Sequence, residues 1–204
     1  MTPRPDVSAE RRAQIIQAAL ACFMRKGYNS TTMDDIVAES GLSKGSLYWY
    51  FKSKDDLLQS AILSFFETSL GYENIAALEE CSTASAKLRF LAQAMVQMGE
   101  WAKGLFNLFL EFWASSPRRE EAAQLWTDLL IQYKDLIVGI IEEGVSSGEF
   151  RPVDAEGLVW PMMAAYDGLA AYLMLMPDLD LKRASRAFVE TLLSGLLVDG
   201  QGEN

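Results

Sequence analysis

Histidine is absent from this chain of 204 residues, and that absence removes several common routes to catalysis. Without imidazole the chain cannot build a Ser-His or Cys-His nucleophile, or a metal site with histidine ligands. Carboxylate pairs such as Glu79–Glu80 and Glu142–Glu143 are present, but adjacent side chains of a helix point apart. We interpret these pairs as solvated faces. The sequence therefore predicts a protein that is not an enzyme and that uses no metal and no cofactor.

Cysteine and long apolar runs are also scarce. The only cysteines, Cys22 and Cys81, lie far apart, so we expect no disulfide scaffold. Cys22 falls on an apolar helix face, where a buried and unreactive thiol is expected. No apolar run approaches the roughly 20 residues that span a bilayer. Residues 1–12 contain no apolar signal region, and we therefore expect a cytoplasmic protein without a membrane partner.

Proline is infrequent, and from about residue 82 onward no strand-like alternation of polar and apolar residues occurs. This pattern predicts a series of helices, near 84–99, 101–115, 118–146, 154–176 and 180–198. Breaks fall at Pro117, Pro152 and Pro177. Pro161 lies inside the fourth of these helices, so it either kinks that helix or marks its beginning. The sequence predicts an all-α fold of about nine helices.

Charge is distributed unevenly along the chain. The net charge is −10, but residues 1–54 hold eight lysines and arginines against five acids, a balance of +3. The remaining 150 residues therefore carry −13. A mildly basic head on an acidic body suits a protein that contacts phosphate at one end only. Simple solubility is an equally good explanation for the acidic body.

The segment from Thr31 to Lys54 is the most informative part of the chain. Its sequence, TTMDDIVAESGLSKGSLYWYFKSK, predicts two short helices joined by a tight turn. Thr32 is a good N-cap for the first helix, and Asp35 completes a capping box. Gly41 is the residue best able to adopt the positive φ of the turn.

The second helix of this segment begins after the N-cap Ser43. Leu47 and Phe51 can face inward together, which leaves polar and aromatic side chains on the other faces. A helix N-terminus with free N–H groups, a lysine and hydroxyls suits phosphate oxygens. The arrangement predicts a helix-turn-helix whose recognition helix is Ser43 to Tyr50.

Helices are also predicted on both sides of this motif. A first helix runs from about Ser8 to Lys26 and stops at Gly27. Ser53 and Asp56 form a capping-box pattern that opens another helix at Lys54.

The motif resembles the DNA-binding domain of TetR-type transcriptional repressors over about a quarter of the chain. The residues that carry the resemblance are Phe23, Lys26, Gly27, Tyr28, Thr31, Thr32, Gly41, Ser43, Lys44, Gly45, Leu47, Tyr48, Tyr50, Phe51 and Lys54. The resemblance implies an N-terminal three-helix DNA-binding domain over 1–54. It also implies a C-terminal helical ligand-binding and dimerisation domain over 55–204. The expected function is that of a ligand-responsive repressor whose homodimer binds a palindromic operator in double-stranded DNA.

Different parts of the motif are assigned different DNA contacts. Phosphates are expected to meet Thr32, Ser43, Lys44, Ser46 and, by resemblance, Lys54. Base edges are expected to meet Gly45, Tyr48 and Trp49, although packing on the phosphate backbone is as plausible for Trp49. Tyr50 either contacts phosphate through its hydroxyl or packs within the head.

The body is rich in large, soft side chains, which are typical both of adaptable ligand pockets and of ordinary cores. The candidate effector-binding residues are Trp101, Phe109, Glu111, Phe112, Trp113, Trp126, Tyr133, Met163, Tyr166 and Asp167. The two acids among them would favour a lipophilic cation as effector. Alternatively, Glu111 faces solvent and Asp167 caps backbone or bonds across a subunit interface.

The last predicted helix carries a stripe of apolar and small residues at helical spacing. Its members are Leu181, Ala184, Phe188, Leu192 and Gly195. By resemblance the last two helices pair with their copies in a second subunit. The stripe would otherwise only complete the core of one subunit.

The alternative function for the whole protein is that of a regulator that binds DNA or protein without responding to a ligand.

Overall fold

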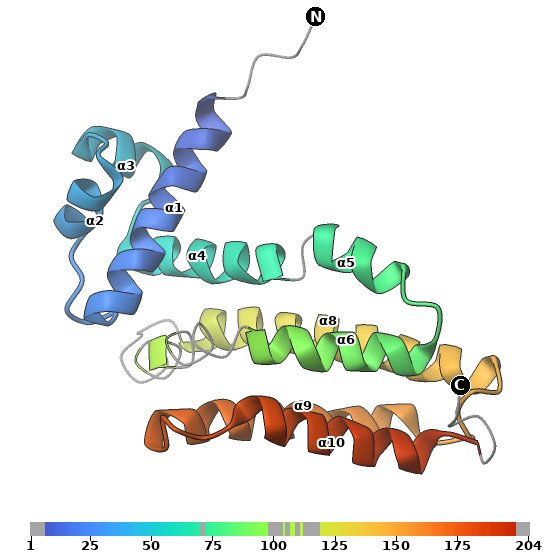
Figure 1. The fold of residues 1–204 in the computed structure, drawn as a ribbon. Helices are drawn as coiled ribbons and strands as arrows, with labels where there is room; N and C mark the ends of the chain where they lie inside the picture. Colours follow the sequence, from blue (N-terminus) through green and yellow to red (C-terminus); the bar gives the residue numbers. More distant parts are fainter. Residues whose placement is uncertain are drawn as a thin grey trace, which may run out of the picture. The chain divides into compact units, whose positions relative to one another are not determined.

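The structure is a computed structural model that describes residues 7–69, 72–97, 104, 107–108, 111 and 119–198. Within these residues the chain forms nine named α-helices, and the only β pairing is an isolated antiparallel bridge between Phe150 and Leu197. The helices are α1 (Val7–Lys26), α2 (Met33–Ser40), α3 (Lys44–Tyr50), α4 (Lys54–Ser69), α5 (Tyr72–Glu79), α6 (Ala84–Gln97), α8 (Arg119–Ser146), α9 (Ala155–Leu175) and α10 (Leu181–Leu196) (Figure 1). The predicted all-α fold is confirmed.

The chain divides into two compact units. The first comprises Met1–Gly71 and Gly104–Leu125, and the second comprises Tyr72–Lys103 and Trp126–Asn204. None of the described helices is both long enough and apolar enough to cross a membrane.

In the first unit α1 packs against α2 and α4 (Figure 1). The buried apolar side chains of these helices, of α3 and of its C-cap recur at helical spacing. They include Ile15, Ile16, Ala19, Leu20, Phe23, Ile36, Leu47, Phe51, Leu57, Leu58, Ala61 and Ile62. Cys22 lies among them as a buried thiol, as predicted. Because α4 packs against α1, the first structural unit extends beyond residue 54, and the predicted functional boundary at that residue stays a prediction.

The helix ends of the head follow the rules that the sequence indicated. Gly27 and Gly41 both adopt positive φ, 79° and 67°, where α1 and α2 end. At the start of α4, Ser53 Oγ accepts a hydrogen bond from the N–H of Asp56. The Asp56 carboxylate accepts from the N–H of Lys52, one residue before the position that a capping box uses.

In the second unit α6 and α9 both pack against α10 (Figure 1). The core comes from α5, α6, α8, α9 and α10; its large buried members are Leu78, Leu88, Ile140, Ile141, Phe150, Val159, Met162, Val189, Leu193 and Leu196. Glu149, between α8 and α9, accepts hydrogen bonds from the first N–H groups of α6, at Ala84 (2.8 Å) and Ser85 (3.0 Å). That carboxylate therefore caps α6 from a distant part of the chain.

Two details of the helical layout differ from the sequence prediction or lie beyond it. A separate α5 interrupts the stretch between α4 and α6, where no helix end was predicted. Most of the predicted helix 101–115 lies outside the described residues. Within that range, residues 104, 107–108 and 111 are described, and all of them are helical. Pro161 lies inside α9, which begins at Ala155 after the N-cap Asp154. The helix therefore does not begin at the proline.

Candidate nucleic-acid interface

The recognition helix α3 separates buried from exposed side chains sharply. Ser43 caps it by accepting a hydrogen bond from the N–H of Ser46 (3.1 Å). Leu47 is fully buried, whereas Tyr48 is 46% and Trp49 73% exposed. Ser43, Lys44 and Gly45 are exposed as well. The helix thus presents a polar and aromatic surface, which it can offer to a DNA groove.

Lys44 is held at this surface by an ion pair that the sequence analysis missed. Its ammonium lies 2.7 Å from Asp34 Oδ1, and both side chains are well exposed. The hydrogen bond to Asp34 raises the pKa of Lys44. An exposed pair of this kind contributes little stability, so Lys44 can exchange Asp34 for a phosphate at small cost. The pairing joins α2 to α3 and has no signature in the local sequence.

The N-cap hydroxyls of Thr32 and Ser43 differ in how many hydrogen bonds they already make within the protein. The Thr32 hydroxyl oxygen accepts from the N–H of Asp35, and the N–H of Thr32 donates to the Asp35 carboxylate at 2.9 Å, which completes the predicted capping box. The Thr32 hydroxyl also donates to that carboxylate, at 2.8 Å. Hydrogen bonds from Lys26 and Thr32 hold the pKa of Asp35 well below its usual range. A phosphate would compete with Asp35 for Thr32. Ser43 accepts a hydrogen bond as a cap, and a hydroxyl in that position can still donate one.

Tyr50 makes its contacts within the DNA-binding head rather than extending from the head's surface. Its hydroxyl donates to Ser8 Oγ at 3.3 Å, and its ring meets that of Trp49 edge to face at 4.5 Å. Tyr50 and Ser46 are both half-buried. These contacts favour the packing role for Tyr50 over a phosphate contact.

Lys54 is engaged by the loop between α1 and α2. Its ammonium donates to the carbonyls of Tyr28 (2.8 Å) and Thr31 (3.0 Å) and lies 4.3 Å from the centre of the Tyr28 ring. Burial lowers the pKa of Lys54, against smaller raising effects of Asp55 and Glu111. A phosphate contact by Lys54 stays a prediction, and it would have to share an ammonium that already fixes this loop.

The candidate effector residues are dispersed. Trp101, Phe109, Phe112 and Trp113 lie outside the described residues. Glu111 falls in the first unit, where its carboxylate accepts a hydrogen bond from the N–H of Asn29 at 3.2 Å.

The remaining candidates lie in the second unit, on α8 and α9. Trp126 and Tyr133 are half-buried on α8, and burial raises the pKa of Tyr133 to about 12. Met163 and Tyr166 pack against the core, and the Tyr166 hydroxyl lies 3.1 Å from Ser185 Oγ. Asp167 keeps solvent contact, although partial burial raises the pKa of its carboxyl.

The predicted dimer stripe on α10 is partly used by the subunit itself. Leu181, Ala184, Phe188 and Leu192 are half-buried, and Gly195 is exposed. Phe188 and Leu192 pack against the core of the second unit.

A second apolar face lies on α9, a helix for which the resemblance predicted pairing across the dimer but for which the sequence analysis named no interface residues. Trp160 and Leu175 are 49% and 81% exposed, and Ala164, Gly168 and Ala171 fall between them on the same helical face. The sequence of α9 is apolar around most of the helix, and such a helix is normally buried on all sides. This pattern could have indicated that the exposed side of α9 needs a partner.

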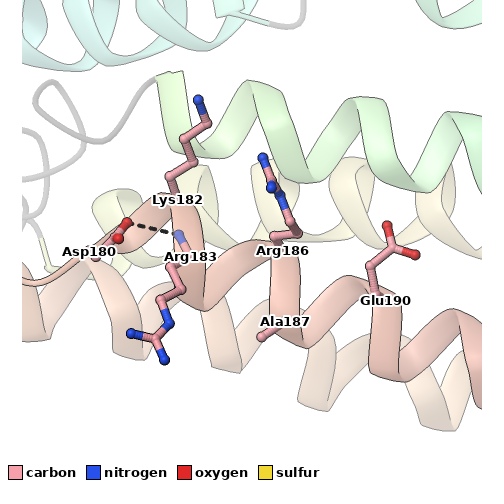
Figure 2. A pocket seen from close by; sticks show the side chains of 6 residues that line it. All are labelled: Asp180, Lys182, Arg183, Arg186, Ala187 and Glu190. Carbon is pink, nitrogen blue, oxygen red and sulfur yellow. Dashed lines mark hydrogen bonds between the residues drawn. The ribbon is translucent and has the colours of Figure 1, made fainter.

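A solvent-open hollow of about 540 Å³ lies along the first half of α10. Figure 2 shows Lys182 and Arg186 extending from one edge of the helix and Arg183 from the other. The two acids of the hollow are already engaged: Asp180 caps α10 through the N–H of Arg183, and Glu190 pairs with Arg89 at 2.8 Å. The hollow is therefore a basic patch on an otherwise acidic body.

A helix-turn-helix with an exposed recognition helix, followed by an all-helical second unit, defines a DNA-binding transcriptional regulator. The family comparisons agree. Residues 15–61 match the family described as bacterial regulatory proteins, tetR family, and residues 84–198 match the BetI-type transcriptional repressor, C-terminal. The chain belongs to the TetR family and is a transcriptional repressor of that type.

Individual relatives show the same relationship. The chain is 30% identical over 161 residues to the repressor KstR2 of Mycolicibacterium smegmatis, covering 72% of this chain and 71% of that protein. It is similar to a TetR regulator structure from Haloarcula marismortui, with a TM-score of 0.81, 22% identity and coverage of 93% and 100%. It is also similar to the structure of Bacillus subtilis FadR in complex with stearoyl-CoA, with a TM-score of 0.71, 26% identity and coverage of 90% and 98%.

Proposed function

We propose that this repressor acts in the cytoplasm as a homodimer that binds a palindromic operator and is released by a lipophilic effector. The exposed, capped recognition helix α3 carries the proposal. Two copies of it, related by a two-fold axis, would contact two half-sites one helical turn of DNA apart.

The apolar face of α9 supports a dimer. Trp160 and Leu175 stand at its two ends, and the small residues Ala164, Gly168 and Ala171 lie between them. A Cβ built on Gly168 meets no described atom within 4 Å, so a second helix could approach closely there. The half-buried stripe of α10 would lie at the edge of such an interface.

Two substitutions separate positioning from base recognition. Lys44→Ala should weaken binding to operator and random DNA alike and lower the salt slope by about one phosphate contact. Tyr48→Ala should act mainly on operator binding, by about 1–3 kcal/mol. Fluorescence anisotropy with DNA from upstream of the repressor's own gene, at several salt concentrations, measures both. If Tyr48→Ala, like Lys44→Ala, weakened binding to operator and to random DNA equally, this division of roles would be contradicted.

A lipophilic effector is supported by the half-buried aromatic and methionine side chains of α8 and α9. Of the two acids predicted to meet a cationic effector, Asp167 lies in the second unit with these side chains. Its pKa is raised by burial, and a bound cation would favour its ionised form. We therefore propose Asp167 as the anionic partner of a lipophilic cation.

An acyl thioester is the second candidate effector. The related FadR structure contains stearoyl-CoA, and the basic hollow of α10 offers Lys182, Arg183 and Arg186 to phosphate groups. The two candidates require opposite charges, so one experiment can distinguish them.

Tryptophan fluorescence should report the effector class. We expect saturable quenching by a lipophilic quaternary ammonium dye at micromolar concentration, with an affinity about ten-fold weaker in Asp167→Asn. Binding of stearoyl-CoA, weakened by Lys182→Ala with Arg186→Ala, would favour the acyl thioester instead. If neither ligand binds or changes operator affinity, a ligand-independent regulator becomes the better description.

A further inference from the structure

We infer that Glu111 is a positioning residue that holds the loop between α1 and α2 in the geometry that binds DNA. The inference rests on the proposed function and deepens it, because it identifies a contact through which the effector-binding half can act on the DNA-binding head. Glu111 was predicted to meet an effector. Its described contacts lie instead in the first unit.

The carboxylate of Glu111 is fitted to the backbone of this loop. Its Oε2 accepts the N–H of Asn29 at 3.2 Å. A Cβ built on Gly27 would lie only 2.8 Å from Oε1 and 3.1 Å from Oε2 of Glu111. Gly27 therefore serves two purposes: it allows the positive φ that ends α1, and it leaves room for the carboxylate.

Gly104, a helical residue that precedes Glu111, also lies against the head. Positions 104, 108 and 111 share one face of a helix. Leu108 is buried, and Gly104 lies so close to Met24 of α1 that a Cβ on the glycine would fall 2.1 Å from the Met24 methyl carbon. Gly104 therefore lies against the C-terminal end of α1, and Glu111 contacts the loop that follows.

The same loop is fixed from a second direction by Lys54. The lysine binds the carbonyls of Tyr28 and Thr31, whereas Glu111 binds the N–H of Asn29. The loop leads directly into Thr32, the N-cap of α2. Removing the carboxylate would free the loop and leave α2 and α3 less firmly oriented, so that DNA binding would have to order them.

The contact spans the two functional halves of the chain. Glu111 belongs to the residues 84–198 that match the C-terminal repressor family, yet it packs in the unit that contains the helix-turn-helix. A displacement of its helix by an effector would act directly on the loop before α2. Such a contact allows a differential interaction of the kind that allosteric coupling requires.

Glutamate variants test this role. Glu111→Ala should weaken operator binding about ten-fold, as expected for losing a charge-assisted hydrogen bond. Glu111→Gln keeps a neutral oxygen that can accept from Asn29 and should restore part of the affinity, because a neutral hydrogen bond is about half as strong as a charge-assisted one. Glu111→Asp withdraws the carboxylate by one methylene and should resemble the alanine variant. Glu120→Ala, an exposed change in the same unit, is the matched control and should behave like wild type.

Hydrogen exchange of the Asn29 amide supplies a second readout. It should accelerate in Glu111→Ala and Glu111→Asp, with melting temperatures close to wild type. Wild-type affinity or unchanged exchange in these two variants would overturn the inference, as would a glutamine variant as weak as alanine. If the alanine variant does not fold, the aspartate and glutamine pair decides. Failure of the wild type to bind operator DNA would count against the proposed function, whereas the exchange data would still test the Glu111 contact.

Discussion

Gly168→Arg is expected to convert the repressor into a monomer that no longer retains its operator. The proposed α9 interface would bury a long, charged side chain at its point of close helix approach, at a cost of about 3–5 kcal/mol. Within one subunit the side chain has open space, because a Cβ at Gly168 meets no described atom within 4 Å. Replacing glycine inside a helix should even favour folding slightly.

Gly139→Arg is a closely matched control for this substitution. Gly139 lies inside α8, and a Cβ built there also meets no described atom within 4 Å. Light scattering after size exclusion should give the mass of two 22.7 kDa chains for wild type and Gly139→Arg, and of one chain for Gly168→Arg. Operator affinity should fall about 100-fold or more with the loss of the second head. A dimeric Gly168→Arg protein would refute the α9 interface.

Leu47→Ala is expected to remove the support of the recognition helix. Leu47 is fully buried and is the inward-facing anchor of the seven-residue α3. Truncating a buried leucine costs about 2–5 kcal/mol, because the cavity is only partly filled by relaxation. Operator binding should fall strongly even at temperatures where the protein remains folded, since Tyr48 and Lys44 lose their fixed orientation.

Leu193→Ala separates this local effect from general destabilisation. Leu193 is similarly buried, but in α10 of the second unit. Hydrogen exchange should accelerate in peptides of α2 and α3 for Leu47→Ala, and in peptides of α6 and α10 for Leu193→Ala. Leu47→Met, which nearly conserves volume, should cost less than about 1.5 kcal/mol. Unchanged exchange in α3 of Leu47→Ala would contradict the anchoring role.

Short-range rules explain why the head could be predicted almost residue by residue. Thr32 and Ser43 cap helices through groups three residues away, and Gly41 ends α2 because its φ is positive. Leu47 and Phe51 are buried because they share a helical face. Each of these features depends on a few neighbouring residues, and the family resemblance rests on the same ones.

Contacts between distant segments could not be predicted in this way. The sequence analysis assigned neither Glu111 nor Lys54 a partner within the head, and the folded chain brings both to the loop between α1 and α2. Their predicted contacts with effector and phosphate stay predictions. The Lys44–Asp34 pair likewise depends on how α2 and α3 cross. No local pattern specifies which backbone amide a carboxylate 82 residues away will meet.

The sequence by itself determined the class of this protein, because helix caps, glycine turns and helical periodicity are set locally and define a helix-turn-helix. Tertiary structure decided which side chains of that motif are available. It engages Lys54 and Tyr50 within the head, and it leaves Tyr48, Trp49 and the α9 face exposed. Burial and pairing arise from the packing of segments far apart in the chain, and only the assembled fold specifies them.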